Sequence, residues 1–344
     1  MSSILDENRP STVIGGAFFI LSVYFFGTRI IFPFFAEKSV MSEISFVDRE
    51  KACQKAFLEG GPFCMLTSPS MDFLMFAVEE EFKRGNNLIA IALAGCRVAL
   101  LHMVIMNNHL HLLVEGSIED IKLFSLRLES LLRKHQKTRG YVLPSDWCFH
   151  ELWIKDLPML RNVIAYISRN PYVASRDATP TGYLWSSGYL LFNPSRRYIE
   201  KGVPFHGLRY REKRSICRSH ELELPERYMV ANEMILPASF VDYQRTEQFF
   251  QSANQYFSYL FRRGEADVEI SRMTGESILL PNDEVFSIVC GWYQVKTTKM
   301  LEQNQRFDAA KRMHRQLGSN PKQIAQILRL PLAQVEQMFP SPSR

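Results

Sequence analysis

One run of residues, from Met103 to Glu115, constrains the fold most strongly, because it is apolar on both sides of a single turn signal. It reads Met-Val-Ile-Met-Asn-Asn-His-Leu-His-Leu-Leu-Val-Glu. Asparagine favours turns, so Asn107-Asn108 predicts the end of one strand and the start of another. Residues two apart share one face of a strand. His109 and His111 are therefore expected side by side, while three apolar residues face a core on the other side: Leu110, Leu112 and Val114.

Two imidazoles on one strand face can bind a single metal ion. A half-exposed strand can also carry such a pair without any function, because short motifs recur by chance. The pair does not select a metal either, since imidazole also binds zinc, copper and nickel. Residues farther along the chain favour the metal site.

A helix is predicted from residue 157 onward, because apolar residues recur there at helical spacing. Pro171 is expected to end this helix near Asn170. Tyr166 and Asn170 are four apart and therefore share a helical face. A phenol that can attack and a carboxamide oxygen that can bind a cation are thus presented together. A half-buried core tyrosine followed by a C-capping asparagine is the alternative. The apolar positions are Leu160, Val163, Ile164 and Ile167.

Three motifs, in this order, resemble those of the single-tyrosine HUH transposases, and within them the REP-associated tyrosine transposases. They are Val104–Val114 with its His-Leu-His, Ala165–Pro171 with Tyr166 and Asn170, and Gly182–Ser187, which reads Gly-Tyr-Leu-Trp-Ser-Ser. The resemblance covers roughly residues 60 to 192. The chain departs from the family pattern at Asn107, where proline is usual, and at Tyr172, where a small aliphatic residue is commoner.

The resemblance implies that His109, His111 and Asn170 bind a divalent ion, Mg²⁺ or Mn²⁺, and that Tyr166 attacks DNA. A cation suits this chemistry because a phosphodiester is already anionic. The phenolate must also be favoured by the metal or a base, since tyrosine has a pKa near ~10 in water. The resemblance further implies a 5′-phosphotyrosine intermediate and a released 3′ hydroxyl, which can later rejoin strands without ATP.

The expected protein is thus a metal-dependent tyrosine transposase that cleaves and rejoins single-stranded or hairpin DNA, with no small-molecule substrate. Homodimer formation stays open. A non-catalytic, sequence-specific DNA-binding protein of the same fold, such as a domesticated transposase, is the alternative. A membrane-anchored metalloprotein is a third hypothesis, which only the N-terminus supports.

The fold class is expected to be α+β, with one helical layer on an antiparallel sheet. The resemblance specifies a ferredoxin-like HUH domain with the histidines on a central strand. Six cysteines form no Cys-x-x-Cys pair, which fits a reducing cytoplasm and, for a DNA transposase, the nucleoid. The pattern predicts strands at 63–67, 88–93, 98–106, 109–114 and 149–154, and helices at 71–83 and 118–137.

The N-terminus carries an uncharged, apolar stretch from Thr12 to Gly27, and apolar character resumes after Arg29. It predicts a short transmembrane helix or an uncleaved signal anchor, which would place the protein in a membrane. A third interpretation is that Met41 starts the working protein. We favour this one, because a DNA transposase has no use for a membrane anchor.

Basic residues suggest where DNA binds. Arg133 and Lys134 lie near the end of the helix predicted at 118–137, where cations also suit the helix dipole. Residues 196–218 form the densest basic stretch and contain interleaved aromatic residues, a combination expected for single-stranded DNA. A solvated linker is the alternative. The candidate phosphate contacts there are Arg209, Arg211, Lys213 and Arg214.

The C-terminal part is predicted to be helical over 282–301, 306–317, 322–328 and 332–339. Asn320 is the expected N-cap of the third helix, and Pro321 its first residue. The last helices resemble a helix-turn-helix that offers Gln334 and Gln337 to a DNA groove. A plain helical packing module is the alternative. We expect five segments: an apolar N-terminal segment (1–40), an HUH transposase domain (55–195), a basic linker (196–225), a helical region (226–300) and a helix-turn-helix-like domain (301–340).

Overall fold

The computed structural model describes residues 20–25, 28–33, 45–71, 73–174, 179–195, 201–218, 223–261, 265–274, 280 and 282–339. The chain divides into two compact units, Met1–Asp48 and Arg49–Arg344. The six cysteines are all free thiols, in line with their spacing.

In the first unit, strands β1 (Ile20–Phe25) and β2 (Thr28–Pro33) pair antiparallel. The prediction of a helix is therefore wrong for these residues. Their β-branched and aromatic side chains suit a strand as well as they suit an apolar helix. Among the residues that the structure describes, no helix has the length and apolarity needed to cross a membrane. The rest of the apolar segment and Met41 lie outside the described residues.

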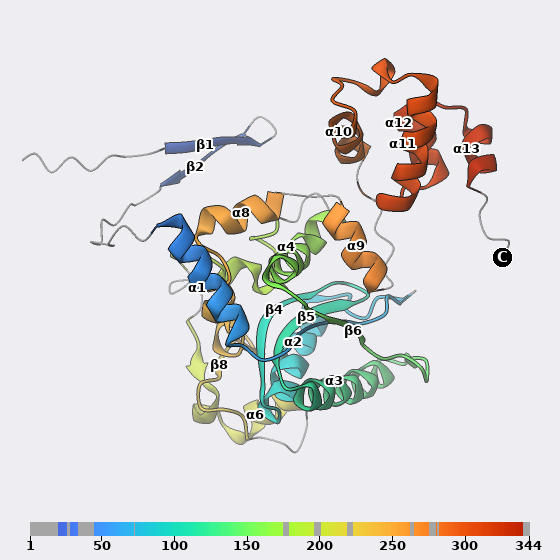
Figure 1. The fold of residues 1–344 in the computed structure, drawn as a ribbon. Coiled ribbons are helices and arrows are strands. Elements are labelled where there is room, and N and C mark those ends of the chain that lie inside the picture. Colours follow the sequence, from blue (N-terminus) through green and yellow to red (C-terminus); the bar gives the residue numbers. More distant parts are fainter. Residues whose placement is uncertain are drawn as a thin grey trace, which may run out of the picture. The chain divides into compact units, whose positions relative to one another are not determined.

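The second unit is built around a four-stranded sheet with the order β4-β5-β3-β6, in which all neighbours are antiparallel. Helix α2 connects β3 to β4, and α3 connects β5 to β6 (Figure 1). The resulting βαββαβ order is the one found in ferredoxin-like folds. The predicted α+β class is confirmed. The bounds are α1 Phe46–Leu58, β3 Phe63–Thr67, α2 Glu79–Ala94, β4 Val98–Ile105, β5 Leu110–Gly116, α3 Ile118–Thr138 and β6 His150–Trp153.

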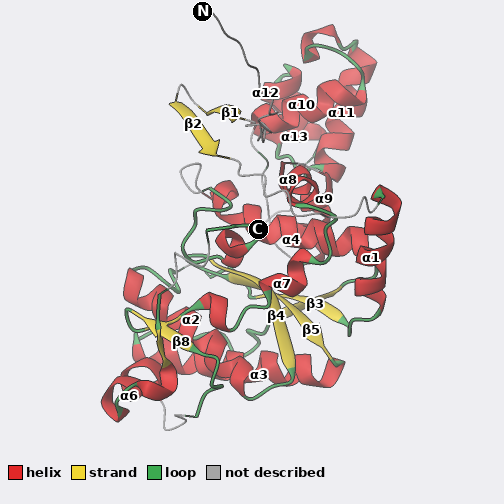
Figure 2. Ribbon diagram, turned by 90° about the vertical axis from the view of Figure 1, so that its left-hand side faces the viewer, coloured by secondary structure: helices red, strands yellow, loops and turns green. Residues whose placement is uncertain are grey.

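Helices cover both faces of this sheet, so the prediction of one helical layer is wrong. Figures 1 and 2 show α2 and α3 on one face and α4 (Leu157–Ala174) on the other. Strand β5 explains why, because its side chains are buried on both faces. Leu112 packs in the core with α2 and α3, whereas Leu113 packs in the core with α4.

Three local predictions fail near this sheet. The helix expected at 71–83 begins only at Glu79, and the described residues between 71 and 78 form no helix. The segment 88–93, expected as a strand, belongs to α2, whose whole second half is buried. A short, fully apolar run cannot be assigned to strand or helix from its periodicity. Helix α4 also continues past Pro171 to Ala174. A proline this close to the helix end removes only the bond to the carbonyl of Ile167 and leaves the earlier turns intact.

Residues 203–218 and 223–235 form a small module on α2. Strands β7, β8 and β9 form a three-stranded antiparallel sheet, and α6 buries Ile216 and Cys217 in the core shared with α2 and α3. Asn87 of α2 accepts a bond from Ile235 N. Within the segment expected as a basic linker (196–225), residues 201–218 are therefore folded, while 196–200 and 219–222 lie outside the described residues. The bounds are η1 Ser187–Leu190, β7 Val203–Pro204, η2 Phe205–Gly207, α6 Tyr210–Cys217, β8 Met229–Ala231, β9 Met234–Ile235 and η3 Pro237–Ser239.

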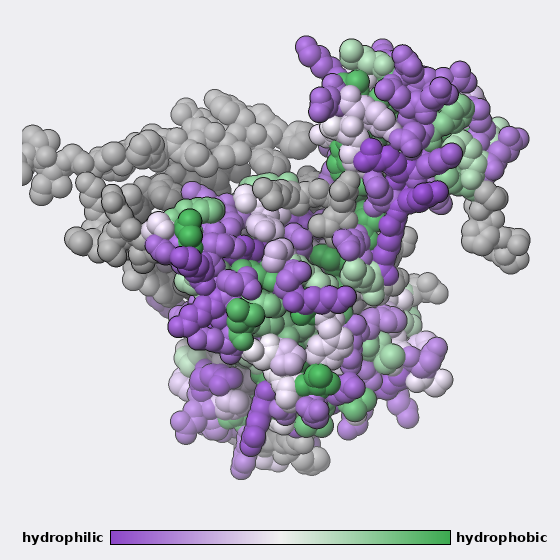
Figure 3. Space-filling view, viewed as in Figure 1, coloured by the Kyte–Doolittle hydropathy of each residue, from purple (hydrophilic) through white to green (hydrophobic). Residues whose placement is uncertain are grey.

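The C-terminal helices α10 to α13 enclose their own apolar core, while Figure 3 shows mainly hydrophilic residues on their surface. Asn320 caps α12 by accepting a bond from Gln323 N at 2.8 Å, as predicted. The helix expected over 282–301 ends at Trp292, and Gln294 then has a left-handed backbone with φ of 52°. The bounds are α7 Tyr243–Glu247, α8 Ala253–Phe261, α9 Glu265–Met273, α10 Asn282–Trp292, η4 Thr298–Met300, α11 Gln303–Gln316, α12 Pro321–Leu328 and α13 Leu332–Met338.

Candidate active site

His111 lies at the centre of the sheet. Strand β5 runs between β4 and β3, which sets His111 opposite Thr67 and Val104. Its ring is fully buried. The Nδ1 atom lies 3.1 Å from Thr67 Oγ1, and Nε2 lies 3.0 Å from Asn170 Nδ2. An amide nitrogen only donates, so Nε2 is the acceptor and Nδ1–H donates to the threonine. Burial lowers the pKa of His111 to about 3, which keeps the ring neutral.

His109 lies one residue before β5 and is half-buried. Its Nδ1 atom donates to Asn108 Oδ1 at 2.8 Å, so its Nε2 atom carries the lone pair. The ring centroids of His109 and His111 are 4.9 Å apart, at an interplanar angle of 86°. The two imidazoles thus lie side by side, as their spacing in the sequence predicts.

Helix α4 brings Tyr166 and Asn170 to the same place. Asn170 contacts His111 directly, and the Tyr166 ring centroid lies 5.5 Å from that of His111. Both α4 residues are buried, with Asn170 8% and Tyr166 2% exposed. Four residues expected to form one site are therefore adjacent, but the tyrosine is shielded from solvent.

The donor set fits a divalent cation. Within the described part of the chain, no group of three or more His, Cys, Asp and Glu is placed to hold a metal ion. Here the third donor is an amide. Rotating the Asn170 carboxamide by a half-turn would present Oδ1 to His111 Nε2 in place of Nδ2. Both histidines carry the Nε2 lone pair, and the hydroxyl of Thr67 fixes the tautomer of His111 as supporting residues do in metal sites.

A second buried histidine, His102 of β4, was not predicted from the sequence. A bulge between Leu100 and His102 turns the His102 side chain towards α4. Its Nδ1 lies 2.6 Å from Ser187 Oγ, and its Nε2 lies 2.7 Å from Ser168 Oγ. The Ser168 hydroxyl in turn lies 3.0 Å from the Tyr256 hydroxyl. The signal in the sequence that could have identified His102 is that it is the one polar residue in the apolar strand β4.

The two predicted cations of α3 differ. The Arg133 guanidinium donates to the carbonyls of four residues in the following loop and lies 5.7 Å from the centroid of the Trp147 ring. This side chain therefore holds the loop, which leaves few donors for a phosphate. Lys134, by contrast, is exposed. The four carbonyls belong to Leu143, Pro144, Ser145 and Trp147.

The predicted cations around α6 are mostly exposed. Arg209, Arg211 and Arg214 all face solvent. Lys213 is half-buried, because its Nζ donates to His206 O at 2.9 Å and lies over the Phe205 ring. A groove of about 810 Å³ adjoins the helix and includes Arg211.

Gln334 and Gln337 lie on α13, as predicted, and line a shallow groove of about 490 Å³. Lys311 of α11 shares the groove and supplies one positive charge. Arg329, in a left-handed conformation with φ of 55°, forms the turn between α12 and α13. The arrangement has the element order expected of a helix-turn-helix.

Comparisons with known proteins give one distant likeness. No protein-family model matches the sequence, and no curated protein matches it. One similar solved structure is that of a REP-associated tyrosine transposase bound to a REP hairpin. The likeness has a TM-score of 0.32 and 13% sequence identity, and covers 38% of this chain and 78% of that one.

Proposed function

We propose that this chain is a divalent-metal-dependent DNA strand transferase of the single-tyrosine HUH type, with Tyr166 as its nucleophile. One observation carries the proposal. Strand β5 with the residue before it and helix α4 bring two histidines, an asparagine and a tyrosine together, with Asn170 Nδ2 3.0 Å from His111 Nε2. Tyr166 lies 55 residues after His111 in the sequence. A packing core has no need for this combination of donors.

The residues have distinct proposed roles. His109, His111 and Asn170 would hold Mg²⁺ or Mn²⁺, which when bound offsets negative charge on the phosphate oxygens. Tyr166 Oη would then attack the phosphorus atom after losing its proton. The bond between phosphorus and the 3′ oxygen breaks, the 3′ oxygen takes up a proton, and the 5′ phosphate stays on the tyrosine. The reverse attack by a 3′ hydroxyl rejoins DNA and restores the phenol.

Attack requires access to Tyr166, which is only 2% exposed. We infer that DNA binding opens the site, since a phosphate must approach within contact distance of Oη. The same burial favours a second candidate function. In a non-catalytic DNA-binding protein of this fold, Tyr166 would be a core residue of α4, packed with Val163 and Ile167.

The substrate is proposed to be single-stranded or hairpin DNA, held mainly by exposed cations. Lys134, Arg209, Arg211 and Arg214 are accessible for phosphate contacts. Lys213 has local partners and should contribute less. Gln334 and Gln337 offer amides that can read base edges.

One experiment separates the two candidates. Labelled hairpin DNA is incubated with the full chain and Mn²⁺ or Mg²⁺, and covalent protein–DNA adducts are resolved under denaturing conditions. We expect an adduct that is absent in Tyr166→Phe and present in Tyr183→Phe, a matched control on another element. DNA binding without any adduct across plausible repeat hairpins would support the binding protein instead.

A further inference from the structure

Two buried polar atoms without a hydrogen-bond partner lie on the facing sides of α2 and α3. They are Arg84 Nε and His135 Nε2. Glu81 contacts Arg139 at one end of this helix pair, and Gly95 lies against the Arg127 guanidinium at the other. The helices are therefore antiparallel. Arg84 and His135 each lie about one turn inward from the Glu81–Arg139 pair, on the same helical faces.

Among the residues that the structure describes, positive charge exceeds negative charge around these atoms. Arg84, Arg139 and Arg218 act on His135, and Glu81 is the carboxylate that opposes them there. Burial, and then these arginines, lower the pKa of His135 to about 4. Burial and the nearby Arg218 lower the pKa of Arg84 to about 10.

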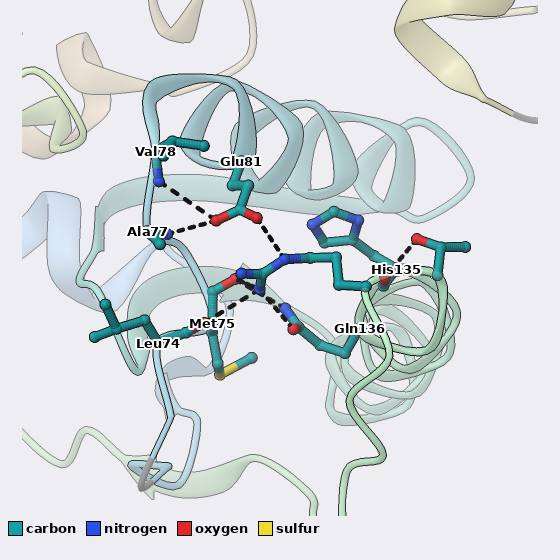
Figure 4. Close-up of polar contacts among 9 residues, drawn as sticks. Leu74, Met75, Ala77, Val78, Glu81, His135 and Gln136 are labelled. Atoms are coloured by element: carbon teal, nitrogen blue, oxygen red, sulfur yellow. Dashed lines mark hydrogen bonds and ion pairs between the residues drawn. The ribbon is translucent and has the colours of Figure 1, made fainter.

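Glu81 is already engaged elsewhere. Its carboxylate accepts a bond from Ala77 N at 2.6 Å and pairs with Arg139, which also donates to Met75 O (Figure 4). Figure 4 shows the His135 ring beside this network, between α3 and α2. The Nη1 atom of Arg84 donates to Ile216 O at 2.7 Å. Within the described part of the chain, no carboxylate pairs with Arg84.

We propose that a phosphate-class oxyanion binds between α2, α3 and the C-terminal end of α6, with Arg84 Nε and His135 Nε2 as donors and Arg218 as a further cation. A water molecule could accept one of these bonds but would leave the charge excess in place. A tetrahedral oxyanion can accept both hydrogen bonds and also offset the positive charge, because it has several acceptor oxygens and matches the geometry of the guanidinium group. His135 is only 7% exposed, so surrounding residues hold its Nε2 donor in place.

The phosphate can come from DNA or from solution. Lys134 immediately precedes His135 in the sequence, and Arg211 and Arg214 lie on α6; all three are exposed. This continuity favours a backbone phosphate, an assignment that rests on the DNA binding proposed above. The anion site itself does not depend on it, nor on Tyr166.

The first test uses inorganic phosphate with the full chain at constant ionic strength, with chloride as the reference anion. We expect phosphate to raise the unfolding temperature saturably and to raise the NMR-measured pKa of His135 by about one unit. Arg84→Gln should weaken phosphate binding about tenfold. Arg315→Gln, an exposed arginine on α11, is the matched control and should change nothing.

If Arg84→Gln does not fold, Arg218→Gln replaces it, because Arg218 is exposed. Phosphate acting no differently from chloride, or acting equally on wild type and the variants, would overturn the site.

The second test measures hairpin binding. A roughly tenfold loss in Arg84→Gln, with a salt dependence shallower by about one phosphate contact, assigns the site to DNA. Unchanged hairpin binding together with lost phosphate binding assigns it to free phosphate. An absent Tyr166 adduct with intact phosphate binding would refute only the proposed catalysis.

Discussion

His102 and His111 are two histidines of one sheet with nearly the same environment but different partners. Both are fully buried, both face α4, and burial lowers the pKa of each to about 3. His102 lies between the hydroxyls of Ser168 and Ser187. His111 lies between the hydroxyl of Thr67 and the amide of Asn170.

The difference shows that burial and a shifted pKa do not by themselves mark a functional histidine. Hydroxyls can donate or accept, so both nitrogens of His102 are satisfied and tie β4, α4 and η1 together. Asn170 can exchange its nitrogen for an oxygen beside His111, and His109 supplies a second imidazole. We therefore assign His102 to stability and His111 to the proposed cation site.

The largest expected effect separates the two histidines by activity. His111→Gln should lower the rate of covalent adduct formation at least about 100-fold, because it removes a proposed ligand. His102→Gln should leave the rate of the folded protein within about threefold, since it touches neither ligand nor nucleophile. Both rates are measured with labelled hairpin DNA. Equal losses of adduct-formation rate in the two variants would contradict the assignment of different roles to His102 and His111.

Acid should destabilise the protein through His102. Its folded pKa of about 3 lies below the unfolded value of 6.5. Above pH 6.5 the ring is neutral in both states and has no effect. Below it, only the unfolded chain takes up the proton, so His102 alone should lower the free energy of unfolding by about 2 kcal/mol between pH 7 and pH 5. His111 and His135, whose folded pKa values are also lowered, add to the fall. Urea unfolding at both pH values checks this, and His102→Gln should show a shallower dependence.

A divalent cation should stabilise the wild type. Mn²⁺ at ten times its dissociation constant should raise the free energy of unfolding by about 1.4 kcal/mol, because it binds only the folded site. His102→Gln should keep this gain and His111→Gln should lose it. Thermal unfolding with and without Mn²⁺ gives the comparison, and Ca²⁺ serves as a control for general charge effects. A gain retained in His111→Gln would place the ion elsewhere.

The smallest effect concerns the supporting hydroxyls. Thr67→Val and Ser187→Ala each remove a hydroxyl beside a histidine Nδ1, and each should cost about 1 kcal/mol or slightly more of unfolding free energy. Only Thr67→Val should also weaken Mn²⁺ binding, by about tenfold, because Thr67 orients a proposed ligand. Calorimetric titration with Mn²⁺ distinguishes the pair. Equal Mn²⁺ affinities in the two variants would contradict the role given to Thr67.

Local signals in the sequence located much of the fold. Asn320 and Pro321 mark the start of α12 because a cap and its first helical residue act within one turn. The long amphipathic pattern after Ser117 gives α3 nearly to the residue. The apolar run at 88–93 misled, since its burial on all sides depends on α3 and the β7–β9 module, which are distant in sequence.

The candidate site divides in the same way. Spacing alone pairs His109 with His111 on one strand and Tyr166 with Asn170 on one helix, because strand and helix periods fix which residues share a face. Only the tertiary structure decides that helix and strand meet at His111. It also shows that the Arg133 guanidinium donates to loop carbonyls, and adds Thr67 and His102, whose contacts join segments far apart along the chain.

The sequence by itself thus determined the elements and the faces on which the chemistry-bearing residues lie, since both follow from local backbone geometry. The tertiary structure decided which faces meet, and it buried Tyr166 in the apolar core between α4 and the sheet. Burial and long-range contacts are set by the packing of the whole unit, which no local pattern encodes.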